Sequence, residues 1–577
     1  MTISQEIKSR FFQVILKFKK QRIILENIIL EFSENEKFGD YSTNFAMKYW
    51  RDFEFKNSYE FASFLTEKLQ KNKHLTKIVS KIEMAGPGFI NFWLKKEVLM
   101  KNLEETLKKK EKYGASQINK GKIVIVEYSS PNIAKPFTIG HLRSTIIGDA
   151  IANLLQATGW KVYRDNHLGD WGTQFGKMIY AIKAWGNEEE IAKSKNPVKD
   201  LVTLYIKFHK QAEKSPSLED EARQWFKKLE DGDGEAKRLW QKCVDWSWLA
   251  FDKIYSKLGV VFSYDFEHGR GLGESFFENK IKAVIDELEE RKLLKVGEKG
   301  AKLVFFKKDK YPPAMILKKD GATLYHTRDL ATDKYRLEKY NPDLIINEVG
   351  AEQTLYFKQL FEIEKLLGWY ASEQRIHIGH GLIRFKEGKM STRKGNAVWM
   401  EDVFQEAQKR AVELGSNDVK LADMVSVGAL KYNDLKRESK TEIIFNWEEI
   451  LNMKGDSGPY LQYVYARCQS VLEKARMKDK KIKFYKKKFI EPKIEELLVL
   501  RWLARFPEVL IKSAEQMAPN LLCNYLFQLC QKFNLFYQKY QILDQPEEQF
   551  RLSLTTAVGQ VIKNGLWLLG IQTPERM

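Results

Sequence analysis

The chain has 577 residues, a formal net charge of +19, and 44% hydrophobic and 13% aromatic residues. This composition excludes a disordered or fibrous chain, and at roughly 100–200 residues per domain the length predicts about three to five domains. The surplus of lysine and arginine favours a polyanionic partner such as nucleic acid, and plain solubility is the alternative explanation.

Residues 1–100 predict an N-terminal α+β domain in which helices are followed by short strands. Within it, Lys81–Phe92 reads K-I-E-M-A-G-P-G-F-I-N-F, an alternating and glycine-punctuated pattern typical of a strand, a turn and a second strand. Residues 101–120 are rich in charge and predict a helical connector.

A parallel sheet is predicted to begin at Lys122–Tyr128, a nearly continuous β-branched run typical of a strand covered on both faces. A one-sided apolar stripe from Leu142 to Leu155 predicts the next helix, closed by Gly159, and Lys161–Arg164 predicts a second strand. Such a βαβ unit is right-handed and places its ligand at the carboxyl end of the first strand. The loop from residue 129 to residue 141 is therefore the expected site.

The remaining pattern completes the predicted fold class. Residues 121–454 predict an α/β, Rossmann-like parallel-sheet catalytic domain with a charged, helical insertion at about 185–290. Residues 455–577 read as helical throughout and predict an all-α C-terminal domain. Further strand-like runs are Ala301–Phe306, Thr323–His326, Leu344–Val349 and Arg375–Ile378.

The four cysteines predict the compartment. They form no C-x-x-C pair, and so few in so long a chain argue against a disulfide framework and against a cysteine zinc site. A reducing cytoplasm fits best. The N-terminal stretch and the later apolar stretches carry charges, so we expect neither a signal peptide nor a membrane span.

The loop after the first predicted strand carries the first candidate site. Gly140 and His141 open the helix, where free backbone N–H groups and the positive end of the helix dipole favour a phosphate. His141 could then donate a hydrogen bond to a phosphate oxygen. A helix cap or a packing histidine is the alternative reading of this pair.

A second candidate site is the stretch 387–396, E-G-K-M-S-T-R-K-G-N, which holds Lys389, Arg393 and Lys394 between glycines. Such a loop could close over a triphosphate and neutralise the charge of departing pyrophosphate. A solvated basic turn is the alternative.

Together, T-I-G-H at 138–141 and K-M-S-T-R at 389–393 resemble the two ATP signatures of class I aminoacyl-tRNA synthetases. The surrounding segments resemble those of the arginyl-tRNA synthetase family. They are E-Y-S-S-P-N-I-A-K-P, L-G-D-W-G-T-Q-F-G and L-Y-H-T-R-D-L-A. F-G-D-Y-S-T at 38–43 and G-P-Y-L-Q-Y-V-Y-A-R at 458–467 resemble that family's N-terminal additional domain and its helical anticodon-binding domain. The resemblance thus spans nearly the whole chain.

The resemblance implies an arginine:tRNA ligase. Such an enzyme activates L-arginine with ATP and Mg²⁺ to arginyl-adenylate, releases pyrophosphate, transfers the aminoacyl group to the 3′ adenosine of tRNA(Arg), and releases AMP. The family uses no covalent protein nucleophile and needs bound tRNA for the activation step. We further expect a cytoplasmic monomer with no structural metal, no editing domain and no membrane partner.

The resemblance also implies roles for particular residues. For catalysis they are His141, Lys135 and Lys389; for ATP binding Thr138, Gly140, His141, Lys389, Met390, Ser391 and Gly379; and for arginine binding Glu127, Asn132, Tyr325, Asp329 and Gln353. A guanidinium is bound best by carboxylates that offer two acceptors in its plane, which suits Glu127 and Asp329. Without the resemblance, a strand-end cap, a core aromatic and a helix start would explain Glu127, Tyr325 and Gln353.

Two positions depart from the family pattern. The first signature usually starts with histidine, where this chain has Thr138, and Thr392 replaces a lysine that is frequent in the second. Lys135, Arg393 or Lys394 could supply the missing cation. The literal H-I-G-H at 377–380 follows a late strand, so we expect its imidazoles to be structural and its backbone at Gly379 to contact ATP at most. A zinc site there would lack a third ligand.

Transfer RNA contacts are predicted in the C-terminal domain. Residues 474–488 carry nine basic residues against one acid and could follow an RNA backbone, with a solvated loop as the alternative. Tyr460, Tyr463, Phe536 and Tyr537 are candidates for stacking on anticodon bases, although some must belong to the core.

Two other functions remain open from the sequence. Another class I synthetase, of the cysteinyl or glutamyl type, would share the ATP signatures. The chain, however, lacks cysteines spaced to bind zinc and carries the segments that resemble the arginyl family. A catalytically inactive RNA-binding paralogue would explain Thr138 and Thr392, but Gly140, His141, Lys389, Met390 and Ser391 are intact.

Overall fold

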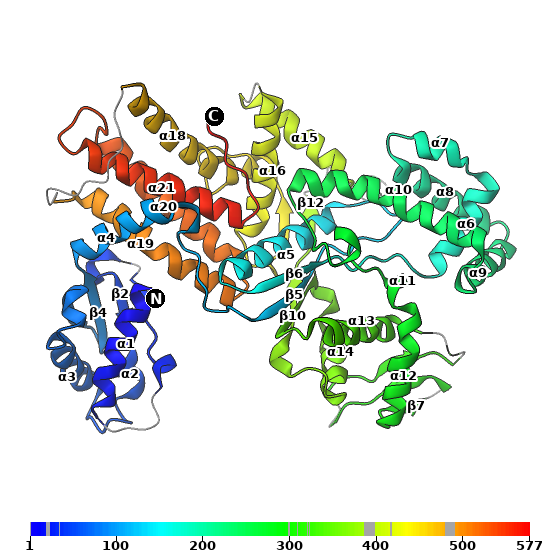
Figure 1. Cartoon of the computed structure of the whole chain (residues 1–577), viewed down its shortest axis with the longest axis horizontal. Helices are drawn as coiled ribbons and strands as arrows, with labels where there is room; N and C mark the ends of the chain where they lie inside the picture. The colour runs from blue at the N-terminus through cyan, green and yellow to red at the C-terminus, as the bar shows by residue number, and fades with distance from the viewer. Residues whose placement is uncertain are drawn as a thin grey trace.

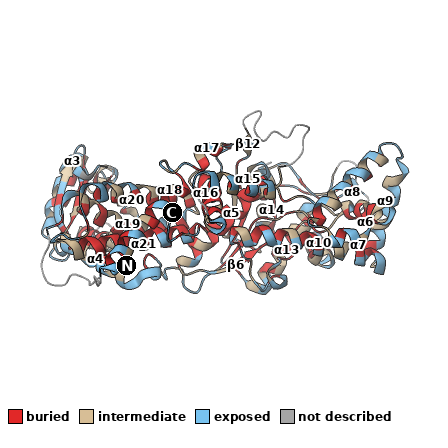
Figure 2. Ribbon diagram, turned by 90° about the horizontal axis from the view of Figure 1, so that it is seen from above, coloured by how far each residue is buried: buried red, intermediate tan, exposed pale blue. Residues whose placement is uncertain are grey.

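The computed structural model describes residues 2–18, 24–33, 35–297, 300–307, 310–319, 321, 323–385, 398–415, 418–478 and 491–577. Within these ranges, no helix is long and apolar enough to cross a membrane. The molecule is elongated: the N-terminal and C-terminal helices lie at one end and the helices α6 to α9 at the other, with the parallel sheet between them (Figures 1 and 2).

The N-terminal region pairs an antiparallel sheet of order β1-β2-β4-β3 with three helices. The expected strand, turn and strand are β3 and β4, which pair from Val79↔Leu94 to Ala85↔Phe89. The predicted order, helices followed by strands, is wrong, because β1 and β2 precede α2 and α3 along the chain. The elements are α1 (Ile3–Leu16), β1 (Glu31–Phe32), β2 (Tyr41–Thr43), α2 (Phe45–Tyr49), α3 (Ser58–Gln70), β3 (Val79–Ala85) and β4 (Phe89–Leu94). The connecting helix α4 (Lys96–Lys109) ends earlier than the predicted connector.

The central sheet is parallel, with the order β11-β10-β5-β6. Its strands are β5 (Ile123–Glu127), β6 (Lys161–Asp165), β10 (Leu344–Gly350) and β11 (Arg375–His380). The chain runs from β5 outward to β6 and later returns to place β10 on the other side of β5. The order therefore reverses between β5 and β10, and the crevice at the carboxyl ends of these two strands is the expected ligand site.

The sheet has a hydrophobic core on each face, because successive strand residues point to opposite sides. Val124 and Val126 pack with α5 (Ile139–Ala157), whereas Ile125 belongs to the core formed with α13 (Tyr325–Tyr340) and α14 (Thr354–Leu366). Gly159 follows α5 with a φ of +98°, as its predicted place just after the helix requires. The predicted βαβ unit is thus present.

Helices and a small sheet separate β6 from β10. The helices are α6 (Thr173–Trp185), α7 (Glu188–Lys193), α8 (Pro197–Ala212), α9 (Ser217–Glu230), α10 (Gly234–Leu258), α11 (Glu274–Phe277) and α12 (Ile281–Glu290). An antiparallel sheet follows, made of β7 (Leu294–Val296), β8 (Lys302–Val304) and β9 (Ala314–Leu317). This small sheet was not predicted beyond the run that contains β8.

One strand prediction is wrong. The run Thr323–His326 was expected to be a strand, but α13 begins at Tyr325. The hydroxyl of Thr327 donates to the carbonyl oxygen of Ile316 at 2.7 Å, and buried Leu330 and Ala331 face the sheet. The apolar periodicity that follows the run therefore decides the helix, and four alternating residues are too few to oppose it.

The rest of the chain packs against the α5 face of the sheet. It comprises β12 (Ile383–Phe385), α15 (Met400–Glu413), α16 (Val419–Leu435), β13 (Ile443–Phe445), α17 (Trp447–Ile450), α18 (Gly458–Met477), α19 (Ile494–Glu515), α20 (Pro519–Lys539) and α21 (Glu548–Leu568). The four last helices form the predicted helical C-terminal region. In Figure 2 buried residues concentrate along α5, α16, α19 and α21, while α7, α8 and α9 show large exposed faces.

Candidate active site

The loop after β5 is held in a strained but well-bonded conformation. Ser129, Ser130 and Ala134 have φ values of +76°, +43° and +58°, which non-glycine residues adopt at a cost. The Ser129 side chain contacts the hydroxyl of Tyr255 at 2.8 Å, and the Ala134 N–H donates to Ser247 at 2.9 Å. These bonds from α10 stabilise the loop at the carboxyl end of the sheet.

The start of α5 carries the first signature. The Thr138 N–H donates to Nδ1 of His141 at 3.0 Å, so the imidazole lies back over the helix N-terminus. Since Nδ1 accepts this bond, the proton of the neutral ring must sit on Nε2. Burial lowers the pKa of His141 to about 4, and Lys135 acts in the same direction. His141 is therefore a neutral imidazole with one N–H left to donate.

Gly140 leaves the first turn of α5 open. It is exposed, and a Cβ placed there would meet only the Thr138 hydroxyl, at an ordinary 3.5 Å. The fold itself would thus accept a side chain at this position. A glycine there keeps the free backbone N–H groups of the helix accessible to an anion.

The residues that follow the second signature form hydrogen bonds with the first signature and the residue before it. Residues 386–397, with Lys389, Met390 and Ser391, lie outside the described residues. Directly after them, the Val398 carbonyl oxygen accepts from the Ile139 N–H at 3.2 Å, and the Met400 N–H donates to Phe137 at 3.0 Å. The chain therefore returns from the second signature to the start of α5, although the two segments are some 250 residues apart in the sequence.

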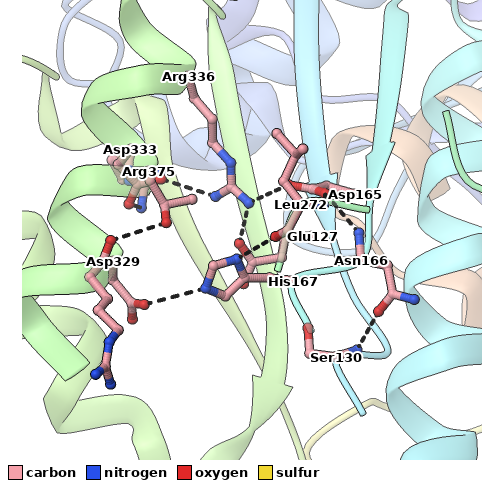
Figure 3. Close-up of polar contacts among 12 residues, drawn as sticks. Glu127, Ser130, Asp165, Asn166, His167, Leu272, Asp329, Asp333, Arg336 and Arg375 are labelled. Atoms are coloured by element: carbon pink, nitrogen blue, oxygen red, sulfur yellow. Dashed lines mark hydrogen bonds and ion pairs between the residues drawn. The ribbon is translucent and has the colours of Figure 1, made fainter. Parts of the chain in front are cut away.

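A cluster of buried charges lies at the carboxyl ends of β5 and β6 (Figure 3). The guanidinium of Arg336, on α13, contacts Glu127 at 2.5 Å, Asp165 at 2.6 Å and Asp333 at 3.0 Å. Burial acts to raise the pKa of Glu127, but the neighbouring Arg336 holds it below its ordinary value. Glu127 is therefore ionised and already bound to a cation of the protein itself.

Asp329 lies one helical turn before Asp333 and has no guanidinium partner among the residues described. Its carboxylate accepts a hydrogen bond from the Tyr356 hydroxyl and lies 3.8 Å from Nε2 of His167. Burial raises the pKa of Asp329 to about 6, and the charges of Glu127 and Asp333 add to this effect. Asp329 is thus the member of the cluster that most lacks a counter-charge.

Glu274, at the start of α11, was not predicted as a site residue. Burial raises its pKa to about 7, His167 and Arg328 counteract this, and Asp329 and Asp170 raise it further. Two carboxyl groups, Glu274 and Asp329, therefore interact across the cluster, each with an elevated pKa. Two neighbouring acids with raised pKa values can accept a bound cation, since its charge would favour their ionised forms.

Asn132 links the loops that follow β5 and β6. It forms an isolated parallel bridge with Gly169, and the Ile133 N–H donates to the Gly169 carbonyl oxygen at 3.1 Å. A Cβ at position 169 would lie only 2.3 Å from Oδ1 of Asn132, so a glycine is needed for this approach. Gly169 of the L-G-D-W-G segment therefore helps to position Asn132.

The other predicted residues differ in exposure. Tyr325 is 68% exposed at the start of α13, Gln353 is exposed at the end of a short helical turn after β10, and Lys135 is exposed beside His141. Gly379 is buried, and a Cβ there would approach Ala351 at 3.0 Å, so packing alone requires a glycine. His377 stacks on Phe357 with ring centroids 4.5 Å apart.

Sequence reasoning missed Arg336, Asp165, His167 and Glu274. Asp329, Asp333 and Arg336 follow the spacing i, i+4 and i+7, which places them on one face of a helix. Asp165 ends the second strand of the βαβ unit and His167 follows it, where a ligand also lies in this fold class. Both signals were present in the sequence, whereas Glu274 lies in a segment without a strand or motif to mark it.

A groove of about 760 Å³ lies on the C-terminal helices and is lined by Tyr460, Tyr463, Arg467 and Asn534 among others. The Arg467 guanidinium lies 4.8 Å from the ring centre of Tyr463 and 4.9 Å from that of Tyr537. Phe536, by contrast, is fully buried and belongs to the core. The lysine-rich run is described only to residue 478, so its remainder lies outside the described residues.

Three family models match the chain in sequence order. The Arginyl tRNA synthetase N terminal domain matches residues 2–94, the tRNA synthetases class I (R), catalytic domain residues 102–447, and the DALR anticodon binding domain residues 461–577. The chain is also 40% identical over 574 residues to an arginine–tRNA ligase of Clostridioides difficile, covering 97% of this chain and 98% of that one.

Further relatives and solved structures agree. An arginine–tRNA ligase of Halothermothrix orenii is 41% identical over 527 residues, which cover 89% of this chain and 90% of the relative. The arginyl-tRNA synthetase of Plasmodium falciparum superimposes with a TM-score of 0.81 at 25% identity, over 100% of both chains. That of Thermus thermophilus gives a TM-score of 0.80 at 23% identity, over 99% of both, which bears on the fold alone.

Proposed function

Because the chain belongs to the arginyl-tRNA synthetase family and ligates arginine to tRNA, we propose that its reaction takes place at the carboxyl ends of β5, β6 and β10. ATP, the substrate of this ligation, would lie over the start of α5, and arginine would lie against the acidic cluster. The observation that carries this proposal is the raised pKa of two buried carboxyl groups, Asp329 and Glu274, that have no guanidinium in an ion pair among the described residues, together with a start of α5 that is open to a phosphate.

In this proposal, the arginine side chain binds between Asp329 and Glu274. A guanidinium presents paired N–H groups to carboxylates, and its positive charge would favour the ionised form of both acids. Asn132, Tyr325 and Gln353 would contact other parts of the substrate. Glu127 would also contact the substrate arginine, and the Arg336 guanidinium, 2.5 Å away, would hold its carboxylate in place.

ATP would be held by backbone and side-chain donors at the start of α5. Gly140 would leave room for a phosphate, the Nε2–H of His141 would donate to a phosphate oxygen, and Thr138 would line the same turn. The predicted roles of Lys389, Met390, Ser391 and Gly379 in ATP binding are kept in the proposal. Mg²⁺ would arrive bound to the phosphates of ATP. Among the described residues, no group of three acidic, histidine or cysteine side chains is arranged so that it could hold a metal ion.

The chemistry would rest on positioning and charge. The arginine carboxylate attacks the α-phosphorus of ATP, and the negative charge that develops on pyrophosphate is stabilised by nearby donors and cations. We assign this role to His141, Lys135 and Lys389. The 3′ adenosine of tRNA(Arg) would then take up the aminoacyl group, and AMP would leave.

The same proposal extends to the rest of the chain. Residues 1–100 and 455–577 would contact the tRNA on either side of a catalytic domain at 121–454, and the groove at Tyr460, Tyr463 and Arg467 would receive anticodon bases. We further propose that the enzyme acts as a monomer in the cytoplasm. The four free, buried cysteines suit a reducing compartment.

ATP–pyrophosphate exchange with each amino acid, with and without tRNA, tests the proposed reaction. We expect exchange with arginine only, and only when tRNA is present. His141→Asn keeps an acceptor for the Thr138 N–H but removes the Nε2–H, so exchange should slow about 100-fold with little change in the KM for arginine. Unchanged exchange in Lys135→Ala would remove Lys135 from the catalytic residues.

A further inference from the structure

His167 lies between the carboxylates of Glu127 and Asp329, on the loop that follows β6 (Figure 3). Its Nδ1 lies 3.1 Å from the carbonyl oxygen of Leu272, and a carbonyl only accepts, so Nδ1 carries a hydrogen and donates. Its Nε2 is buried, lies 3.8 Å from Oδ1 of Asp329 and has no hydrogen-bond partner among the residues that the structure describes. Most buried polar atoms in proteins are hydrogen-bonded, so this nitrogen calls for an explanation.

The surroundings of this nitrogen are acidic. The titratable and charged groups that face it are Glu127 on β5, Asp329 and Arg336 on α13, Glu274 on α11, Asp170 on its own loop, and Tyr356 on α14 through Asp329. Arg336 is the one guanidinium in this set that bonds to the cluster, and its charge is shared among three carboxylates. An imidazolium at position 167 and the guanidinium of a bound arginine would therefore satisfy the same carboxylates.

We propose that His167 carries a proton on Nε2 while arginine is absent from the pocket and releases it to solvent when the arginine side chain binds. The Nε2–H bond breaks, the proton passes to the buffer, and the electron pair remains on Nε2. The neutral ring then accepts a hydrogen bond from an N–H of the substrate. This inference rests on the proposed function, because it requires arginine to bind beside Asp329.

The electrostatics agree with this geometry. Burial favours the neutral imidazole, yet Glu127 and Asp329 raise the pKa of His167 above its ordinary value. Because the Nδ1 hydrogen is held by Leu272, the exchangeable proton is the one on Nε2. A guanidinium bound beside Asp329 would add a nearby positive charge and lower the pKa of His167.

The direction of the pH effect follows by linkage. If arginine lowers the pKa of His167, then binding releases a proton at every pH between the two values. The affinity for arginine therefore rises with pH in that window, by at most about tenfold per pH unit for one proton. Glu274, with a pKa of about 7, and Asp329, with a pKa of about 6, would also lose protons to a bound cation in overlapping pH ranges, so a count of released protons does not identify His167.

The test observes the imidazole directly. The whole chain, labelled with ¹³C at histidine, is titrated by NMR from about pH 5.5 to pH 8.5, with and without saturating L-arginine. The signal of His167 is the one lost in His167→Asn, which keeps an N–H for Leu272, and His167→Gln serves for the same assignment should the first variant not fold. We expect the midpoint of the His167 titration to lie above the ordinary pKa of histidine. Saturating arginine should lower this midpoint by about one pH unit or more. A midpoint that arginine does not move overturns the proposal.

Two further measurements make the outcome specific. His326 lies on the same helix as Asp329, and burial lowers its pKa to about 4, so its signal should report a neutral ring with and without arginine. Asp329→Asn should lose arginine binding. Binding to this variant with wild-type affinity would overturn the proposed site, whereas lost binding together with an immobile His167 midpoint in the wild-type chain would overturn the proton exchange alone.

Discussion

Two buried arginines differ in how their charge is balanced. Arg143 on α5 contacts one carboxylate, Asp434, at 3.0 Å, and its remaining N–H groups donate to the carbonyl oxygens of Gly381, Thr441 and Ser439 at 2.7, 2.8 and 3.0 Å. Arg336 on α13 faces three carboxylates instead. Both side chains are 1% exposed. Burial alone therefore does not distinguish the charge cluster around Arg143 from the one around Arg336.

The surplus of charge separates them. At Arg143 one cation meets one anion and three dipoles, and the cluster joins α5 to α16 and to the segment before β13. At Arg336, Asp333 is shared with Arg375, which also contacts Glu364 at 2.8 Å, and Asp329 and Glu274 lie beside this network. Burial raises the pKa of Glu364 well above its ordinary range, and even with that acid neutral the carboxylates outnumber the guanidiniums. A balanced cluster stabilises the fold, whereas a surplus of acid can bind a cation.

The largest expected effect concerns the balanced cluster. Arg143→Met should destabilise the chain by about 3–5 kcal/mol, because it leaves the Asp434 carboxylate and three carbonyl oxygens without their donor in a buried position. Urea unfolding would measure the loss. The matched control is Arg384→Met, which breaks the exposed pair with Glu442 and should cost about 0–1 kcal/mol. Equal losses in the two variants would contradict the structural role of Arg143.

The next effect concerns activity. Asp329→Asn keeps the shape of the side chain but removes the charge that would face the arginine guanidinium. We expect kcat/KM for arginine in aminoacylation to fall about 100-fold or more, which corresponds to about 2.7 kcal/mol, with the KM for ATP little changed. A loss smaller than about threefold would mean that the guanidinium binds elsewhere.

A smaller effect of opposite sign is expected in the stability of the same variant. The folded chain raises the pKa of Asp329 from its ordinary 3.8 to about 6. Since the folded state binds this proton more tightly than the unfolded state, ionisation of Asp329 costs stability as the pH rises from about 4 to about 6, and the full cost remains above pH 6. Asp329→Asn should therefore stabilise the chain by about 1–3 kcal/mol at pH 8.

The measurement for this stability effect is the Tm of the variant relative to wild type at pH 8 and at pH 5. The advantage of the variant should shrink at the lower pH, where wild-type Asp329 is mostly protonated. An Asp329→Asn variant that is less stable than wild type at pH 8 would place Asp329 with the balanced cluster of Arg143. The proposed difference between the charge-balanced cluster at Arg143 and the acid-rich cluster at Arg336 would then be wrong.

Much of the framework could be read from local pattern. The strands β5, β6, β10 and β11, the helix α5 and the glycine after it follow from runs of β-branched residues and from apolar periodicity, which act over a few residues. Thr323–His326 was read wrongly because a four-residue alternation carries little information beside the longer helical pattern that follows. Short strands such as β7, β9 and β12 lack a pattern of their own and form by pairing with a neighbour.

The candidate site divides in the same way. The sequence by itself determined the two signature segments and predicted the helix start at Gly140 and His141 from residue type and local spacing, whereas the acids Glu127 and Asp329 were predicted from the resemblance to the family. Only the tertiary structure decided that Glu127 is bound by Arg336, 209 residues away, and that Nε2 of His167 lies 3.8 Å from Asp329 with no hydrogen-bond partner in the part of the chain that the structure describes. Charge balance in a buried site is the sum over residues that the fold brings together, and no local pattern contains that sum.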